Sequence, residues 1–370
     1  MMHRKLVLLA WVVSAPVSMA NATEYAVPAG TDVGKWFAQL PADATSVVFS
    51  LAAKYHSSGD INLPAQKMLV IDGRGSSLTL GAGSNGFTFP VANMEQAMQR
   101  TNSRYVIKDF ADITGGRKAI DLKGSFGTVI SNLNLVSQSE TALDLRFCLM
   151  TRLQNVRVTN PVNKGFVLRQ GDWPGANAAN SQCNSSVLEQ CRVYCAKTTT
   201  AAFTILNSGG VRMTECVSEG ESCDYDLFLS ATMDGDESRT ANNPVVKSFT
   251  LSNFHVEHAV RKASIYVNMP SMAVVNLSNI YWNGPQRAPV LLYTMGQVNL
   301  SDIGWWGQNF WIGTRINAPR IDIARVPSQV TLGEGVAVKG NRAGIIRLTD
   351  PLQGNGTLQL NYVKVRQKSM

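Results

Sequence analysis

The largest group of acid–base side chains in the sequence lies between residues 219 and 262. The group comprises Glu219, Glu221, Asp224, Asp226, His255, Glu257, His258, Arg261 and Lys262. Histidine, lysine and carboxylate groups are the side chains that act in general acid–base catalysis. Together with one more arginine, part of this group forms the candidate catalytic set. The set is Arg169, Asp226, Glu257, His258, Arg261 and Lys262.

A basic row precedes this group. Lys123, Arg146 and Arg169 follow one another at intervals of 23 residues, and Asp121 and Asp144 stand beside the first two. Such a row can bind the carboxylates or sulfates of an anionic glycan. It can equally be a surface ladder of ion pairs, each contributing little stability. The candidate substrate-binding residues are Lys123, Arg146, Trp173 and Tyr266.

Two kinds of enzyme chemistry fit these groups. A uronate lyase neutralises the sugar carboxylate with Arg or Lys, removes the adjacent proton with a base, and protonates the leaving oxygen. A glycoside hydrolase needs two carboxylates, for which Asp224, Asp226 and Glu257 are candidates. A non-catalytic glycan-binding or surface-attachment protein is the third possibility. No cofactor or metal site is expected, although Ca²⁺ could bind the acids Asp234, Asp236 and Glu237.

An internal repeat organises most of the chain. Segments such as IKDFAD, ISNLNL, LQNVRV and LSNFHV place a polar residue before an apolar one, most often about 23 residues apart. The polar residues are Asp109, Asn132, Asn155, Gln190, Glu215, Asn253, Asn279 and Asp302. A second column stays in phase with the first, through Asp121, Asp144, Val167, Thr204, Phe228, Tyr266 and Leu291.

The repeat predicts short strands that stack coil upon coil. One strand cannot bury its apolar face alone, whereas stacking lines the inward residues into apolar ladders. The polar position is expected at a bend, where stacked amides hydrogen-bond neighbouring coils. Helices of a βαβ sheet have no room between the repeats. The predicted fold is therefore all-β, a right-handed parallel β-helix (solenoid) of about nine or ten coils.

Two long insertions interrupt the repeat at the same corner. They are Gly171–Asn184 and Ala231–Pro244, and they are expected to wall a groove, where loops on a rigid scaffold collect binding groups. The start of the chain reads as a signal peptide, with Arg4 and Lys5 before an apolar run. The predicted division is a signal peptide over 1–22, an N-terminal cap over 23–45, a β-helix domain over 46–348, and a C-terminal cap or tail over 349–370.

The cysteines and the charge point to an exported protein. Six cysteines and the export signal favour disulfides over a metal site. The candidate pairs are Cys148 with Cys183, Cys195 with Cys223, and Cys191 with Cys216. The net charge of +8 suits an acidic polysaccharide, an anionic cell envelope or nucleic acid. We expect a secreted or periplasmic monomer or homotrimer whose partner is an anionic polysaccharide, with no nucleic acid and no membrane insertion.

The pattern resembles the pectate-lyase-like superfamily of parallel β-helices. VIDGRGSSLTL over 70–80 resembles a first coil, and DVGKWFAQL over 32–40 resembles a helix that caps the N-terminal end. The resemblance covers residues 28–345 and implies architecture more than activity. The polygalacturonase and pectate lyase motifs are absent, so no catalytic residue is carried over. The predicted function is action on a uronate-containing polysaccharide by β-elimination.

Overall fold

The computed structural model describes residues 23–177, 179–230, 248–268 and 274–283, together with the strands β20 to β27. Side chains are described as far as residue 280. The predicted signal peptide, the second insertion at 231–244 and the acids Asp234, Asp236 and Glu237 lie outside the described residues. Neither helix in the described part of the chain is long and apolar enough to cross a bilayer.

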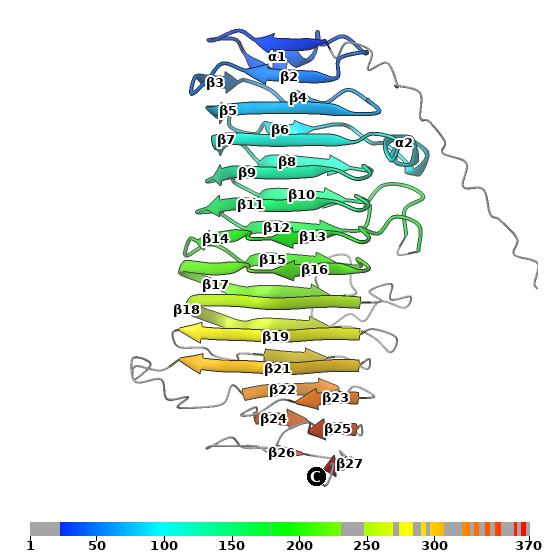
Figure 1. The fold of residues 1–370 in the computed structure, drawn as a ribbon, viewed down its shortest axis with the longest axis vertical. Helices are drawn as coiled ribbons and strands as arrows, with labels where there is room; N and C mark the ends of the chain where they lie inside the picture. The colour runs from blue at the N-terminus through cyan, green and yellow to red at the C-terminus, as the bar shows by residue number, and fades with distance from the viewer. Residues whose placement is uncertain are drawn as a thin grey trace, which may run out of the picture.

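All paired strands are parallel and belong to one sheet of 27 strands. In a first series, each strand pairs with the next, and Figure 1 shows them stacked along the long axis. This series contains β1 (Glu24–Val27), β2 (Ser46–Phe49), β5 (Leu69–Leu80), β7 (Tyr105–Gly115), β9 (Val129–Val136), β11 (Arg152–Thr159), β13 (Val187–Glu189), β16 (Val211–Thr214), β18 (Ser248–Asn268), β19 (Val274–Asn283), β21 (Gln297–Trp306), β23 (Gln329–Leu332), β25 (Ile345–Leu348) and β27 (Lys364–Gln367).

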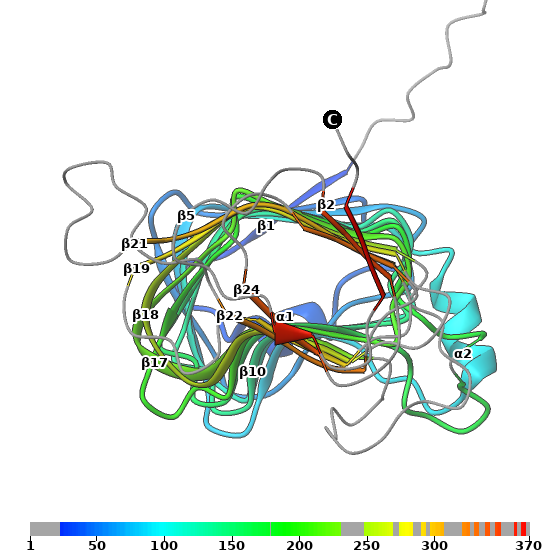
Figure 2. The ribbon, with the colours of Figure 1, turned by 90° about the horizontal axis from the view of Figure 1, so that it is seen from below.

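A second series runs along another side of the stack. It contains β4 (Ile61–Asn62), β6 (Asn85–Thr88), β8 (Lys118–Lys123), β10 (Thr141–Arg146), β12 (Lys164–Arg169), β15 (Ala201–Leu206), β17 (Val217–Ser230), β18, β20 (Val290–Tyr293), β22 (Arg320–Arg325), β24 (Ala337–Gly340) and β26 (Gln359–Leu360). Two further short strands are in neither series. The strand β3 (Lys54–Ser57) pairs with β5, and β14 (Arg192–Cys195) pairs with β11 and β17. Seen from the end in Figure 2, the strands close around the interior.

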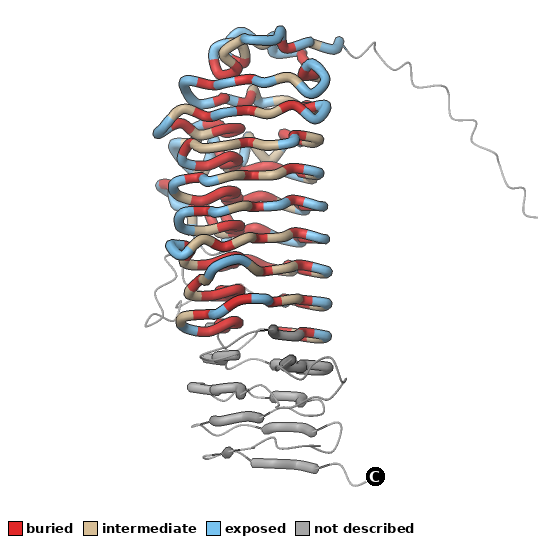
Figure 3. The backbone as a smooth tube through the Cα atoms, turned by 90° about the vertical axis from the view of Figure 1, so that its left-hand side faces the viewer, coloured by how far each residue is buried: buried red, intermediate tan, exposed pale blue. Residues whose placement is uncertain are grey.

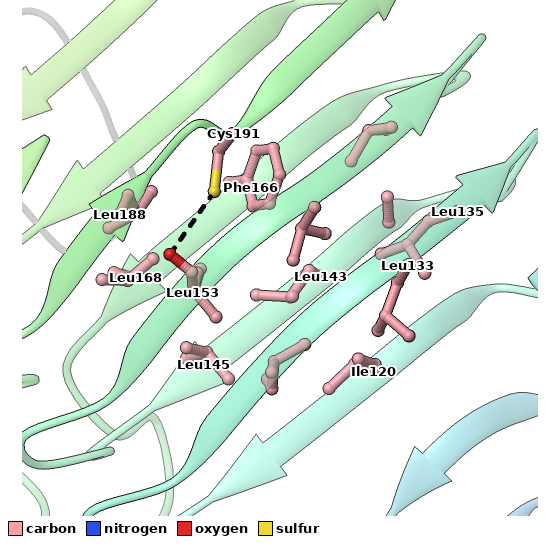
Figure 4. Close-up of a cluster of buried hydrophobic side chains, with 14 of the residues drawn as sticks. Ile120, Leu133, Leu135, Leu143, Leu145, Leu153, Phe166, Leu168, Leu188 and Cys191 are labelled. Carbon is pink, nitrogen blue, oxygen red and sulfur yellow. Dashed lines mark hydrogen bonds between the residues drawn. The ribbon is translucent and has the colours of Figure 1, made fainter. Parts of the chain in front are cut away.

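The interior is apolar because alternate residues of each strand face it. Figure 3 shows buried and exposed segments alternating along the levels that are coloured by burial. Leu145 and Leu168 occupy the same register position in neighbouring strands, and both are completely buried. Figure 4 shows them among leucines from adjacent levels. Each fully buried leucine contributes about 1.5–3 kcal/mol relative to an exposed one.

The predicted bends are confirmed at the polar column. Asp109, Asn132 and Asn155 have φ values of 61°, 54° and 50°. Asn132 Nδ2 donates to Asp109 Oδ1 at 2.8 Å, and Asn155 Nδ2 donates to Asn132 Oδ1 at 2.9 Å. Asparagine and aspartate tolerate this left-handed backbone better than most residues do. The stacked side chains therefore hold the turn from level to level.

The fold class predicted from the sequence, a right-handed parallel β-helix of nine or ten coils behind a capping helix, is wrong as stated. The all-β class and parallel pairing are observed, but the strands form a single closed sheet whose first series alone has fourteen strands in the described chain. The two repeat columns end at Leu291 and Asp302, so a count of the sequence repeats did not include the last strands.

The expected capping helix over 32–40 is also corrected. Only five residues there are helical, α1 (Val33–Phe37), and they contact β3 and β4 beside the first strands. Asp32, whose backbone is extended, caps the N-terminus of α1 because its side chain accepts a hydrogen bond from Lys35 N. A second helix, α2 (Met94–Arg100), was not predicted and lies on the flank of the stack in Figure 2.

Candidate functional site

A cluster of charged side chains covers the outer side of β8, β10 and β12. We call it the charged cluster, and it consists of Lys118, Asp121, Lys123, Asp144, Arg146, Lys164, Arg169 and Asp172. The residues between them, Leu122, Leu145 and Leu168, face the apolar interior. The strand alternation therefore sends Asp121, Lys123, Asp144, Arg146 and Arg169 outward, and Lys118 joins them by its contacts with Asp121 and Asp144. Five cations against three carboxylates leave the cluster positive.

Three aspartates hold the two arginines in place. Arg169 donates from Nε and Nη2 to Asp144, both at 3.0 Å, and from Nη1 to Asp172 at 2.9 Å. Arg146 donates to Asp172 at 2.9 Å and also to Asp121. Bidentate pairs of this kind fix the guanidinium plane. Asp172 belongs to the first insertion, so that loop contributes directly to the cluster.

The aspartates of the charged cluster are held ionised. Burial opposes the charge on Asp144, but Arg169 and then Lys118 outweigh it, and the pKa of Asp144 lies well below its usual range. The pKa of Asp121 is lowered in the same sense, because Arg146 and Lys118 overcome its burial. The Lys118 ammonium lies 2.7 Å from Asp144 Oδ2.

Lys164 differs from the other cations of the charged cluster. Burial lowers its pKa, and the nearby positive charge of Arg169 lowers it further. Its ammonium makes no hydrogen bond or ion pair among the described residues. Lys164 pairs with Ala201 and Arg169 with Leu206, and those two partners belong to one cluster on the outer side. Lys164 and Arg169 therefore lie on the same side of β12.

A wall borders the charged cluster on one flank. Met94 N, in the first turn of α2, donates to Pro174 O of the first insertion at 3.1 Å. Trp173 packs with Ala97 of α2 and Phe147, and only 7% of it is exposed. The predicted sugar contact Trp173 is thus an anchor for the wall in this structure. The second predicted wall, 231–244, lies outside the described residues.

Further along the second series, the charged surface gives way to an aromatic one. Tyr266 stacks on Phe228 with ring centroids 4.6 Å apart, and Tyr225 packs against both. Phe228 follows Asp144 by three levels in the same column, as the repeat predicted. Tyr266 is buried.

The predicted catalytic residues separate into three places. Asp226 and His258 lie in the interior, where His258 Nε2 is 2.6 Å from Asp226 Oδ1. Asp226 raises the pKa of His258 although burial opposes this. Arg169 belongs to the charged cluster. Because the interior pair is sealed from the outer surface, these residues do not meet in one cleft.

The remaining predicted residues lie on the outside at another corner. Arg261 donates to Asp224 Oδ1 at 2.6 Å and to the carbonyl of Thr199. The half-exposed Lys262 lies 3.7 Å from Asp224. Glu257 Oε1 lies 2.8 Å from His255 Nε2. Arg261 thus stabilises a turn through its hydrogen bonds to Asp224 and to the carbonyl of Thr199.

The predicted disulfides are not formed, and all six cysteines are free and buried. The predicted partners are nonetheless neighbours. Cys148 N donates to Cys183 Sγ at 3.3 Å, and Cys191 lies beside Cys216. The thiols of Cys148, Cys183, Cys191 and Cys216 hydrogen-bond to main-chain carbonyls, as Cys191 does to Leu153 O at 3.8 Å (Figure 4). Stacking on adjacent levels explains why the predicted partners are neighbours.

Sequence reasoning missed Lys118, Lys164 and Asp172. The first two occupy the same place in their repeats, five residues before Lys123 and Arg169. Aligning the repeats one residue at a time would have shown this second basic column. Asp172 carries no such signal, because it lies in an insertion.

No family model and no curated protein matches the chain. One similar solved structure is an alginate lyase from Paenibacillus sp. str. FPU-7. The two chains are 10% identical with a TM-score of 0.43, over 92% of this chain and 98% of that chain. A likeness at this level carries no statement about the chemistry of this chain, which must be argued from its own residues.

Proposed function

We propose that the protein binds an acidic, uronate-containing polysaccharide along the outer side of β8, β10 and β12 and cleaves it by β-elimination. The observation that carries this proposal is Lys164. It is a lysine with a lowered pKa beside an arginine that is already oriented by two carboxylates. A lysine amine that gives up its proton more readily than usual, next to a fixed guanidinium, is the pair that proton abstraction beside a carboxylate requires.

Binding would use the excess positive charge of the charged cluster. Arg169 and Lys123 each expose part of the side chain, 20% and 17%. A sugar carboxylate reaching Arg169 would take up a charge-assisted hydrogen bond in a surface partly shielded from water. Repeating cations on successive levels suit a polymer that carries a carboxylate on each residue.

The elimination would proceed at one sugar. Arg169 neutralises the carboxylate on C5, which acidifies the C5 proton. Lys164 in its unprotonated form takes that proton, the C5–H electron pair forms the C4–C5 double bond, and the C4–O4 bond breaks with its electrons on oxygen. The Lys164 ammonium then returns the proton to O4. The step needs no oxidant, reductant or metal.

A non-catalytic glycan-binding protein is the second candidate. It is favoured by the dispersal of the predicted catalytic residues, since Asp226 and His258 are interior while Arg261 and Lys262 lie at another corner. In that case the charged cluster would bind the same polymer without cutting it.

The test is incubation of the full chain with a panel of polyuronates, followed by ultraviolet absorbance of the unsaturated product. We expect product with one member of the panel. Co-sedimentation with insoluble polysaccharide separates the candidates, because binding without product supports the second. No binding and no product across polymannuronate, polyguluronate, polygalacturonate and hyaluronate would overturn both.

A further inference from the structure

The interior of the stack contains one polar cluster that the proposed function does not use. It is formed by Cys195 of β14, Cys223 and Asp226 of β17, and His258 of β18. The two sulfur atoms and a ring nitrogen of His258 all lie within 4.8 Å of one another. This is the one such group of metal-binding side chains in the described part of the chain.

We propose that Cys195, Cys223, His258 and Asp226 form a binding site for a divalent transition-metal ion, Zn²⁺ by its ligand chemistry. Two sulfur atoms and an imidazole suit zinc, which binds Cys and His in tetrahedral sites and accepts carboxylate as a further ligand. The proposal departs from the prediction from sequence spacing that no metal is bound.

Two of the distances between the proposed ligand atoms match the edges of a tetrahedron. With zinc–ligand lengths of about 2.3 Å to sulfur and about 2.0–2.1 Å to nitrogen or oxygen, such a site separates sulfur from nitrogen by about 3.6 Å and sulfur from oxygen by about 3.5 Å. Cys223 Sγ lies 3.6 Å from His258 Nε2 and 3.5 Å from Asp226 Oδ1. His258 and Asp226 are closer, at 2.6 Å, and would part slightly to admit the ion.

A local irregularity brings these ligands together. The pairing of β17 with β18 shifts register between Glu219 and Ser222 and again between Cys223 and Tyr225. Cys223 and Asp226 are three residues apart, yet both are completely buried. A regular strand would turn residues three apart to opposite sides. Bulges that re-aim side chains are often found beside functional sites.

Surrounding groups support the proposed ligands. Ser264 Oγ donates to Asp226 Oδ2 at 2.6 Å, and Ser218 Oγ donates to Asp226 Oδ1 at 2.6 Å. Hydrogen bonds of this kind orient a ligating carboxylate. Gly220 has no side chain where a Cβ would lie 2.5 Å from Cys195 O, so β14 can approach β17 closely.

The test uses the purified full chain, reduced and freed of metal, and titrates it with Co²⁺ and then Zn²⁺. We expect one equivalent of Co²⁺ to give the intense visible bands of tetrahedral cobalt with sulfur-to-metal charge transfer, and Zn²⁺ to remove them. The near-isosteric variants Cys195→Ser and Cys223→Ser should lose the bands and keep the strand content of the parent.

The matched control is the double variant Cys191→Ala, Cys216→Ala. That pair is also buried and adjacent but has no histidine or carboxylate in its group. It should keep the cobalt bands. The proposal is overturned if the reduced chain gives no bands, if the bands survive in Cys223→Ser, or if peptide mapping of unreduced protein finds Cys195 bonded to Cys223.

Discussion

Arg169 grips the buried carboxylate of Asp144 with two hydrogen bonds of 3.0 Å, from Nε and Nη2. The pair joins neighbouring strands of the second series, because Arg169 is on β12 and Asp144 on β10. Asp144 also accepts from Lys118, so one carboxylate fixes two cations. The charged cluster is therefore preorganised before any ligand arrives.

Removing the central carboxylate should cost more stability than removing the outer one. Asp144→Asn removes the buried carboxylate that Arg169 and Lys118 share, and breaking a buried pair typically costs about 3–5 kcal/mol. Asp172→Asn is the matched control, since 35% of its side chain is exposed and such pairs contribute about 0–1 kcal/mol. Urea unfolding measures both. Equal losses would contradict this account of the cluster.

The stability of the chain should fall in acid. The pKa values of Asp121, Asp144 and Asp172 are all lowered, in each case because arginine outweighs burial. Their ionised forms stabilise the folded chain above the unfolded-state value of about 3.9, and this contribution is lost as pH falls through the folded-state pKa values.

Urea unfolding at a series of pH values below neutrality measures this loss. The free energy of unfolding should decline below about pH 4 in the parent. The decline should be shallower in Asp144→Asn, which lacks the group with the strongest shift. An identical decline in both proteins would show that other groups govern acid unfolding.

The bend column should tolerate glycine better than alanine. Asn155 has a φ of 50° and donates to Asn132. Asn155→Ala loses that hydrogen bond and leaves in the left-handed backbone a Cβ without the short polar side chain that eases this conformation, which costs about 1–2 kcal/mol. Asn155→Gly loses only the hydrogen bond at the folded bend. Thermal unfolding should rank the parent above the glycine variant and the glycine variant above alanine. An Asn155→Ala variant that is as stable as the parent would contradict the claim that alanine is strained in this left-handed backbone.

Gly220 should be intolerant of any side chain. Its φ is 113°, and a Cβ there would lie 2.5 Å from Cys195 O. Gly220→Ala should lower the free energy of unfolding by about 1–3 kcal/mol or more. The control is Gly59→Ala, where nothing lies within 4 Å of an added Cβ. Equal unfolding midpoints for the two variants would count against the close packing of β14 on β17.

The sequence predicted the stacking well because stacking is a local rule repeated many times. The phase of the polar column located the bends at Asn132 and Asn155, and the alternation in β10 located the inward leucines. The two repeat columns end at Leu291 and Asp302, so the strands from Arg320 to Leu348 were covered only by the predicted bounds of the β-helix domain, and β26 and β27 fell in the predicted C-terminal cap or tail. The helix α2 was not predicted because it is inserted between levels and has no counterpart in the other repeats.

The site was predicted less well, for a physical reason. Pattern reasoning took Asp226 and His258 as candidate catalytic residues, whereas a bulge turns Cys223 and Asp226 into the interior. A bulge adds a residue without changing composition, so a two-residue period cannot reveal it. Lys164 occupies the same position in its repeat as Lys118. Its proposed role as a base depends on its burial and on the nearby Arg169, and only the folded chain brings these together.

The most direct measurement of the central claim is the initial rate of unsaturated-product formation by the parent and by Lys164→Arg on the most reactive polyuronate. Arginine keeps the positive charge but cannot act as a base near neutral pH, so the rate should fall by about 10²–10⁴-fold. Binding to the same polymer should persist. Lys67→Met, at an exposed lysine on the loop before β5, should keep the parent rate. A Lys164→Arg variant that matches the parent would contradict the assignment of Lys164 as the base.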